Sequence, residues 1–185
     1  MAIEIEKKYR IDKKSLVELT ARLGELNAEF AYETFEENYL HKGGLLDGRA
    51  AVLRLRKTDH RTTLTYKEKV TTEGEFKHQI EFETDVSDVD ATESIIEKLG
   101  YKLSVIYEKH RKAWRLNKVE VVLDELPFGY YMEIEGEIED ILEAEKLLGA
   151  DRFETESRGY PRLSLKHGKL VNGITESRFV KTTSG

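Results

Sequence analysis

The feature that most constrains this chain is a recurring pattern in which charged residues alternate with apolar ones. It is clearest at the start, where one set of alternate residues is charged throughout: Glu4, Glu6, Lys8 and Arg10. The intervening set is mostly apolar and includes Ile5, Tyr9 and Ile11. Because successive side chains of a β-strand point to opposite faces, the pattern predicts a strand with one charged and one apolar face.

Similar patterns predict further strands at residues 28–40, 51–57, 62–70, 77–85, 103–116, 120–126 and 130–137. Several carry pairs of charged residues two positions apart: Arg54 and Arg56, Lys67 and Lys69, Glu81 and Glu83, Lys109 and Arg111, and Glu133 and Glu135. Apolar residues at helical spacing predict three helices, one capped by Asp12, one by Ser87 or Asp88, and one over residues 138–148. We also expect a short helix over residues 160–167 and a polar tail that frays from residue 175.

The three amphipathic helices need an apolar surface to cover, and the apolar faces of the strands are the surface on offer. If the helices pack outside a curved sheet, the charged faces point into its concavity or into a closed barrel. The sequence therefore predicts an α+β fold with a charged interior.

Length and composition fit a single domain. The chain has 185 residues, and we expect one domain over 1–185, with its core at 3–150 and with residues 151–185 closing or flanking the interior. Charged residues make up 36% of the chain, above the usual share of about a quarter. The net charge of −6 argues against a general nucleic-acid binder.

Several classes of site and location are disfavoured. Cysteine is absent, which excludes disulfides and thiolate metal sites, and the five histidines lack a zinc spacing. No apolar run approaches the length of a signal-peptide core or a membrane span. We expect a cytoplasmic protein with no membrane partner, as a monomer or a homodimer.

A charged interior is costly unless opposite charges or a ligand balance it, since two like charges 5 Å apart repel by about 3 kcal/mol at an effective dielectric near 20. The inward carboxylates form an all-oxygen set suited to Mg²⁺ or Mn²⁺: Glu4, Glu6, Glu81, Glu83, Asp124, Glu133 and Glu135. The inward cations suit a ligand with several phosphates: Lys8, Arg54, Arg56, Lys67, Lys69, Lys109 and Arg111. A metal-bound polyphosphate satisfies both sets.

The segment Glu4-Ile5-Glu6-Lys7-Lys8 resembles the Glu-x-Glu-x-Lys signature of the CYTH superfamily, also called triphosphate tunnel metalloenzymes. This superfamily includes class IV adenylyl cyclases, thiamine triphosphatases and inorganic triphosphatases. The resemblance extends, in order, to Leu53-Arg54-Leu55-Arg56, Thr65-Tyr66-Lys67, Glu81-Phe82-Glu83, Glu108-Lys109-His110-Arg111, Asp124-Glu125-Leu126 and Met132-Glu133-Ile134-Glu135. It implies a closed antiparallel eight-stranded β-barrel, or tunnel, with helices packed outside.

The resemblance also implies roles for individual residues. Metal ligands would be Glu4, Glu6, Glu133 and Glu135, with Asp124, Glu81 and Glu83 as further candidates. Triphosphate contacts would be Lys8, Arg54, Arg56, Lys67, Lys109 and Arg111, with Lys69 nearer a strand end. Glu4, Glu6 and Lys8 are the expected catalytic residues, and Arg158 or Lys166 would close the site from the C-terminal segment.

Three functions remain open at this stage. We favour metal-dependent hydrolysis of a phosphoanhydride in an inorganic or organic triphosphate, since hydrolysis requires only a positioned water. The alternative is a class IV-type adenylyl cyclase that converts ATP to cyclic AMP and pyrophosphate. A non-catalytic polyphosphate or nucleotide sensor would explain the cations but would leave the acidic set without a purpose.

Overall fold

The computed structural model describes residues 3–73 and 75–180. Its elements are β1 (Ile3–Ile11), α1 (Lys13–Glu25), β2 (Glu29–Lys42), α2 (Leu45–Gly48), β3 (Ala51–Lys57), β4 (Thr62–Glu73), β5 (Phe76–Asp85), α3 (Val89–Lys98), β6 (Lys102–Leu116), β7 (Val119–Leu126), β8 (Gly129–Glu135), α4 (Ile138–Leu148), η1 (Ala150–Arg152), β9 (Glu154–Thr155), α5 (Tyr160–His167), β10 (Lys169–Val171) and β11 (Ile174–Ser177). Every strand and helix expected from the sequence patterns is present, and α2, η1, β9, β10 and β11 are additions.

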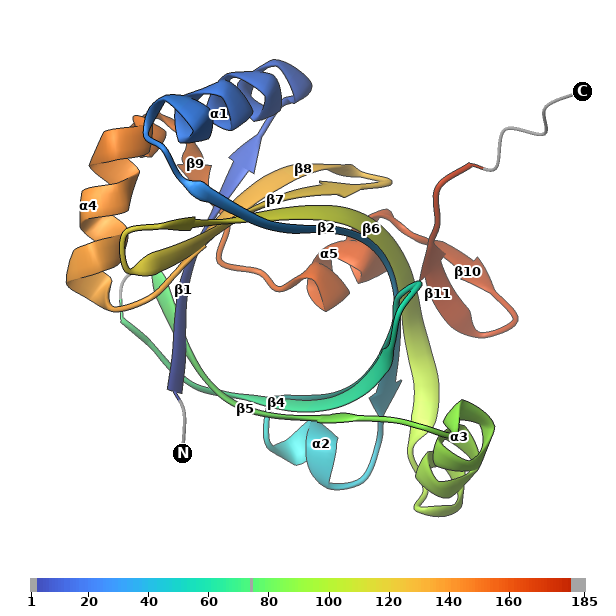
Figure 1. Cartoon of the computed structure of the whole chain (residues 1–185). Coiled ribbons are helices and arrows are strands. Elements are labelled where there is room, and N and C mark those ends of the chain that lie inside the picture. Colours follow the sequence, from blue (N-terminus) through green and yellow to red (C-terminus); the bar gives the residue numbers. More distant parts are fainter. Residues whose placement is uncertain (1–2, 74, 181–185) are drawn as a thin grey trace, which may run out of the picture.

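Eight strands form a closed, fully antiparallel ring. Their order is β6-β2-β3-β4-β5-β1-β8-β7, and the pairing of β7 with β6 completes the circle (Figure 1). Each strand turns one face to the inside of the ring, so the alternation in sequence becomes an inner charged face and an outer apolar face. The expected closed antiparallel fold is confirmed.

Helices α1 and α4 lie outside the ring and cover the outer face of β1, β6, β7 and β8 (Figure 1). Leu19 and Leu23 of α1 pack with Ile141 and Leu148 of α4 in one buried apolar cluster. The amide of Ser15 donates a 2.7 Å hydrogen bond to Asp12, which caps α1 as the sequence predicts. Within the described part of the chain, no helix is long and apolar enough to cross a membrane.

Helix α5 lies across the ring rather than on its outer surface (Figure 1). Tyr160 and Leu163 share one face of α5 and are both buried. They pack against apolar and aromatic residues of the surrounding strands: Leu40, Val105, Tyr107, Leu126 and Tyr131. This buried cluster fills one end of the ring. The expectation that helices pack outside the ring is therefore correct for α1 and α4 but not for α5.

The tail also differs from the expectation that it frays from residue 175. Residues 174–177 form β11, which pairs in parallel with β6 and in antiparallel with β10. The guanidinium of Arg178 then forms ion pairs with Glu37, Glu108 and Glu176, which fixes the segment against the ring. Residues 181–185, the last part of that predicted tail, lie outside the described residues.

Candidate active site

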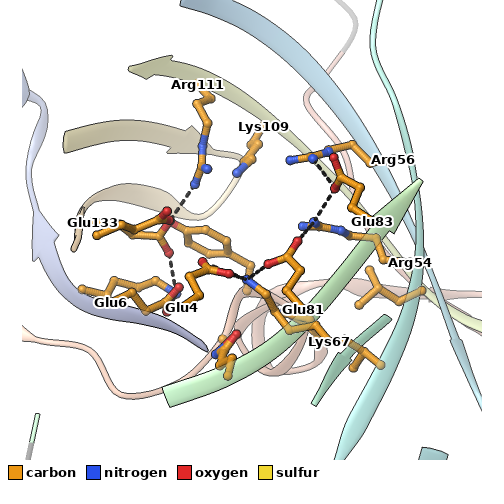
Figure 2. A pocket seen from close by; sticks show the side chains of 18 of the residues that line it. Glu4, Glu6, Arg54, Arg56, Lys67, Glu81, Glu83, Lys109, Arg111 and Glu133 are labelled. Atoms are coloured by element: carbon orange, nitrogen blue, oxygen red, sulfur yellow. Dashed lines mark hydrogen bonds and ion pairs between the residues drawn. The ribbon is translucent and has the colours of Figure 1, made fainter. Parts of the chain in front are cut away.

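The inside of the ring holds a cavity of about 480 Å³. It is lined by Glu4, Glu6, Lys8, Tyr32, Leu40, Val52, Arg54, Arg56, Lys67, Gln79, Glu81, Glu83, Tyr107, Lys109, Arg111, Glu120, Glu133, Glu135, Gly159, Tyr160 and Pro161. Most of the residues singled out from the sequence are therefore brought together, and Figure 2 shows their carboxylates and cations pointing toward one another from opposite walls.

Three carboxylates form the tightest acidic cluster. Glu4 and Glu6 are adjacent on the inner face of β1, and Glu135 of β8 lies opposite Glu6 in the strand register. One carboxylate oxygen of each lies within 4.8 Å of the other two. Such an all-oxygen set fits a hard divalent cation such as Mg²⁺ or Mn²⁺.

The cluster is short of counter-charge. Burial, together with the hydrogen bond to Glu81, raises the pKa of Glu4 to about 8. Burial and the neighbouring Glu133 raise the pKa of Glu135 to about 7. A bound cation would relieve this repulsion, so the residues present fit a divalent metal.

Glu6 is better balanced, because a lysine that was not singled out from the sequence lies beside it. Burial and Glu133 would raise the pKa of Glu6, but the ammonium groups of Lys8 and Lys77 outweigh them and lower it. Lys77 Nζ lies 2.7 Å from the Glu6 carboxylate. The sequence could have identified Lys77, because it lies an even number of positions from Glu81 and Glu83 on β5 and so faces the same side of the strand.

Lys67 of β4 bridges two of the acidic side chains. Its Nζ lies 3.0 Å from Glu4 and 2.8 Å from Glu81. Although burial opposes it, the hydrogen bond from Glu4 and the charge of Lys67 lower the pKa of Glu81 to about 2. The contact between the two carboxylates therefore shifts their pKa values in opposite directions, up for Glu4 and down for Glu81.

Two arginines of β3 form the opposite wall. Arg56 lies 2.7 Å from the carboxylate of Glu83, and Arg54 lies 3.8 Å from Glu81. Thr65 donates a hydrogen bond of 2.9 Å to Glu83 and so fixes its orientation. These guanidiniums are held by carboxylates that a polyanionic ligand can replace.

Arg111 and Asp124 form a buried ion pair next to the cavity. The Nε of Arg111 donates a 2.7 Å hydrogen bond to Asp124, and one Nη donates at 2.6 Å to Glu133. Asp124 also accepts a 2.7 Å hydrogen bond from the Tyr160 hydroxyl, and it does not line the cavity. We therefore assign Asp124 to the orientation of Arg111 rather than to direct metal contact.

Tyr160 is a second residue that was not singled out from the sequence. Lys8 Nζ lies 3.9 Å above the centre of its ring, and Lys109 Nζ lies 5.3 Å from it. Cation–π contacts of this kind stabilise a buried ammonium. No local signal indicated this, because Tyr160 reaches the site only through the packing of α5 inside the ring.

Glu36 is the third such residue and sits among the cations. It is 2% exposed, and its carboxylate lies 3.5 Å from Lys109 and 3.7 Å from Arg56. Burial opposes ionisation, but Lys109, Arg111 and Arg56 outweigh it and lower the pKa of Glu36 to about 2. Glu36 is two positions from Asn38 on β2, so the alternation of the strand places both side chains on the inner face.

The remaining sequence candidates lie elsewhere. Lys69 is exposed on β4 and does not line the cavity. The Arg158 guanidinium binds Glu156 at 2.6 Å, and only the Arg158 carbonyl reaches the site, accepting from Lys8 at 3.3 Å. Lys166 is exposed, and Arg10, which had no assigned role, also pairs with Glu156 at 2.7 Å.

The sequence of this chain resembles those of known proteins. A family model described as the CYTH domain matches residues 2–160. A protein of Methanocaldococcus jannaschii that carries the name of an adenylate cyclase is 30% identical over 153 residues, which is 79% of this chain and 83% of the relative.

Solved structures share the fold. A conserved hypothetical protein from Pyrococcus furiosus superposes with a TM-score of 0.75 at 25% identity, over 86% of this chain and 99% of that one. A Hippeastrum protein named as an adenylyl cyclase, and described as having a dominant triphosphatase activity, superposes with a TM-score of 0.68 at 17% identity. That match covers 95% of this chain and 100% of the other.

Proposed function

Because the chain belongs to the CYTH domain family, whose members are triphosphatases or adenylyl cyclases, we propose that it hydrolyses a phosphoanhydride of an inorganic or organic triphosphate. The observation that carries this proposal is one cavity that combines two sets of side chains. The acidic cluster of Glu4, Glu6 and Glu135 suits a divalent cation. The cations of the same cavity suit a triphosphate: Lys8, Arg54, Arg56, Lys67, Lys109 and Arg111.

Substrate binding would exchange partners within the cavity. Arg54 and Arg56 point at Glu81 and Glu83, and a triphosphate offers them more negative charge than these glutamates do. Lys8 and Arg111 are held by Glu133, which keeps both cations in place before the ligand arrives. Such prepositioned charges stabilise a phosphoryl transition state without reorganising during the reaction.

Glu4, Glu6 and Glu135 would hold the divalent cation. When bound, it would withdraw charge from the phosphate oxygens and favour ionisation of the attacking water. The proton of that water would pass to one of the inward carboxylates of the same cavity. The phosphate that leaves remains paired with the cations that held it.

The second candidate is the adenylyl cyclase reaction, in which the ribose hydroxyl of ATP replaces water as the attacking group. The name of the Methanocaldococcus jannaschii relative favours it. The reaction would use the same cations and the same acidic cluster. A third candidate, a sensor without turnover, would use the cations but leaves the acidic cluster unexplained.

A product analysis separates the three candidates. Purified protein is given tripolyphosphate, thiamine triphosphate or ATP with Mg²⁺ or Mn²⁺, and orthophosphate, pyrophosphate and cyclic AMP are resolved. Release of orthophosphate supports hydrolysis. Formation of cyclic AMP with pyrophosphate would contradict hydrolysis and support the cyclase reaction. Binding without any product would support a sensor.

A further inference from the structure

The cavity has a closed end. Tyr160 and Leu163 of α5 pack there against Leu40, Val105 and Tyr131, and all five side chains are buried. Figure 1 shows α5 within the outline of the ring. A ligand therefore enters and leaves from the other end.

Exposure along the inner face of β2 identifies the open end. Leu40 and Asn38 are 3% and 0% exposed, and Glu36 is 2% exposed. Thr34 is half-buried, and Tyr32 is 40% exposed. Because these residues follow one another on the same face, the series runs from the floor at Leu40 to the mouth at Tyr32.

The backbone of β2 directs Tyr32 into this mouth. The pairing of β2 with β6 shifts register between Phe30 and Tyr32, so that Phe30 lies opposite Trp114 and Tyr32 opposite Ala113. A bulge of this kind reorients the side chains that follow it. Phe30 packs edge-on against Trp114, with ring centres 5.5 Å apart, whereas Tyr32 lines the cavity.

Tyr32 has no partner that explains its position. Among residues 3–73 and 75–180, no hydrogen bond or aromatic contact involves its side chain. A half-exposed aromatic ring at the rim of a cavity offers a flat apolar face to whatever occupies the mouth. Its neighbours there include Arg111 and Glu120.

The position of the cations sets the orientation of a ligand. Lys8 and Lys109 lie against Tyr160 at the floor, and Arg111, which is opposite Thr34 of β2 in the strand register, lies nearer the mouth. A triphosphate held by this set would carry any organic substituent outward, past Tyr32. The cavity of about 480 Å³ is within the range of about 300–1,000 Å³ for pockets that hold organic ligands.

Resting on the function proposed above, we propose that Tyr32 is a specificity-determining residue whose ring stacks on the base of a nucleoside triphosphate. The terminal phosphate then points toward Tyr160 and the nucleoside occupies the mouth. Tyr32 would favour such a substrate over inorganic triphosphate without contacting the phosphates. Stacking of a base on an aromatic side chain changes affinity by about 5- to 150-fold on alanine substitution.

The test compares two ligands in calorimetry with a chelator present, so that the readout does not depend on turnover. We expect Y32A to weaken ATP binding at least 5-fold while the Kd of tripolyphosphate changes less than 2-fold. Y32F retains the ring and is expected to retain the wild-type ratio of the two affinities. F30A, on the same strand but on the outer face, serves as the matched control and is expected to retain that ratio as well.

Three results would overturn the inference. The first is an equal loss, or no loss, for both ligands in Y32A; the second is a loss in Y32F as large as in Y32A. The third is a wild-type protein that binds tripolyphosphate but not ATP, which leaves the triphosphatase proposal intact. If neither ligand binds the wild-type protein with the chelator or with Mg²⁺ or Mn²⁺ in its place, the proposed function is overturned, and this inference with it.

Discussion

The hydroxyl of Tyr160 donates a hydrogen bond of 2.7 Å to Asp124, although the two residues are 36 positions apart in the chain. Asp124 also binds Arg111, which in turn binds Glu133. The contact therefore joins α5, which closes the ring, to the cations that we assign to the substrate. The closed end and the charged site are parts of one hydrogen-bonded network.

Loss of this hydroxyl should destabilise the protein. In Y160F the ring remains beneath Lys8, but the carboxylate of Asp124 loses a buried donor. We expect the free energy of unfolding in urea to fall by about 1.5–3 kcal/mol, as for hydrogen bonds to charged groups. Y130F, which removes a longer and more exposed bond of 3.3 Å to Glu125, is the matched control and should cost less. Equal losses in the two variants would contradict the network described above.

Two lysines of β4 should behave differently toward a triphosphate. Lys67 lines the cavity and binds Glu4 and Glu81, whereas Lys69 is exposed and does not line it. We expect K67A to weaken tripolyphosphate binding by about tenfold or more, in line with the loss of a charge-assisted bond. K69A should change it less than twofold. Calorimetry of both variants checks the assignment, and a larger effect of K69A would show that the ligand extends beyond the cavity.

Glu135 should strengthen metal binding and should lower the stability of the folded protein when no metal is bound. E135Q removes an anionic ligand, so we expect Mn²⁺ affinity, measured by titration, to fall by about tenfold or more. It also removes a half-buried negative charge beside Glu6 and Glu133, so the metal-free protein should melt at a higher temperature. E125Q, on the neighbouring strand and outside the cavity lining, is the control for both measurements. Unchanged Mn²⁺ affinity in E135Q would place the cation elsewhere.

Much of this architecture follows from alternation in the sequence, because the face to which each side chain of a strand points depends only on its position along that strand. Glu4, Glu81 and Arg54 share the cavity because each occupies an inward position. Alternation does not show how far along the strand the cavity extends. Lys69 is two positions from Lys67 and is expected on the same face, but it is exposed and does not line the cavity.

The residues that the sequence did not identify depend on distant contacts. Tyr160 reaches the site because α5 packs inside the ring, and Arg158 turns away because Glu156 binds its guanidinium. Residues 174–177 form β11 through a parallel pairing with residues of β6 that lie 70 positions earlier in the chain. Lys77 and Glu36 differ from these residues, because the alternation of their own strands already places their side chains on the inner face.

The ionised Glu36 should make the protein acid-sensitive. Its pKa is lowered to about 2 despite burial, because Lys109, Arg111 and Arg56 surround it, so its contribution is present above its unfolded pKa of 4.5 and is lost as pH falls. Between about pH 5 and pH 3, wild type should lose about 2 kcal/mol more unfolding free energy than E36Q. E33Q alters an exposed carboxylate of the same strand and should follow the wild-type profile. Parallel profiles for wild type and E36Q would contradict the assignment.

The central claim, that water attacks a triphosphate inside this ring, is tested most directly by hydrolysis in ¹⁸O-labelled water. With Mg²⁺ or Mn²⁺ and tripolyphosphate or ATP, we predict that one labelled oxygen enters a phosphate product in a reaction that E6Q abolishes. E6Q should first be shown to fold, by its melting curve. Cyclic AMP and pyrophosphate formed without the label would contradict the claim, as would labelled product formed at the same rate by E6Q.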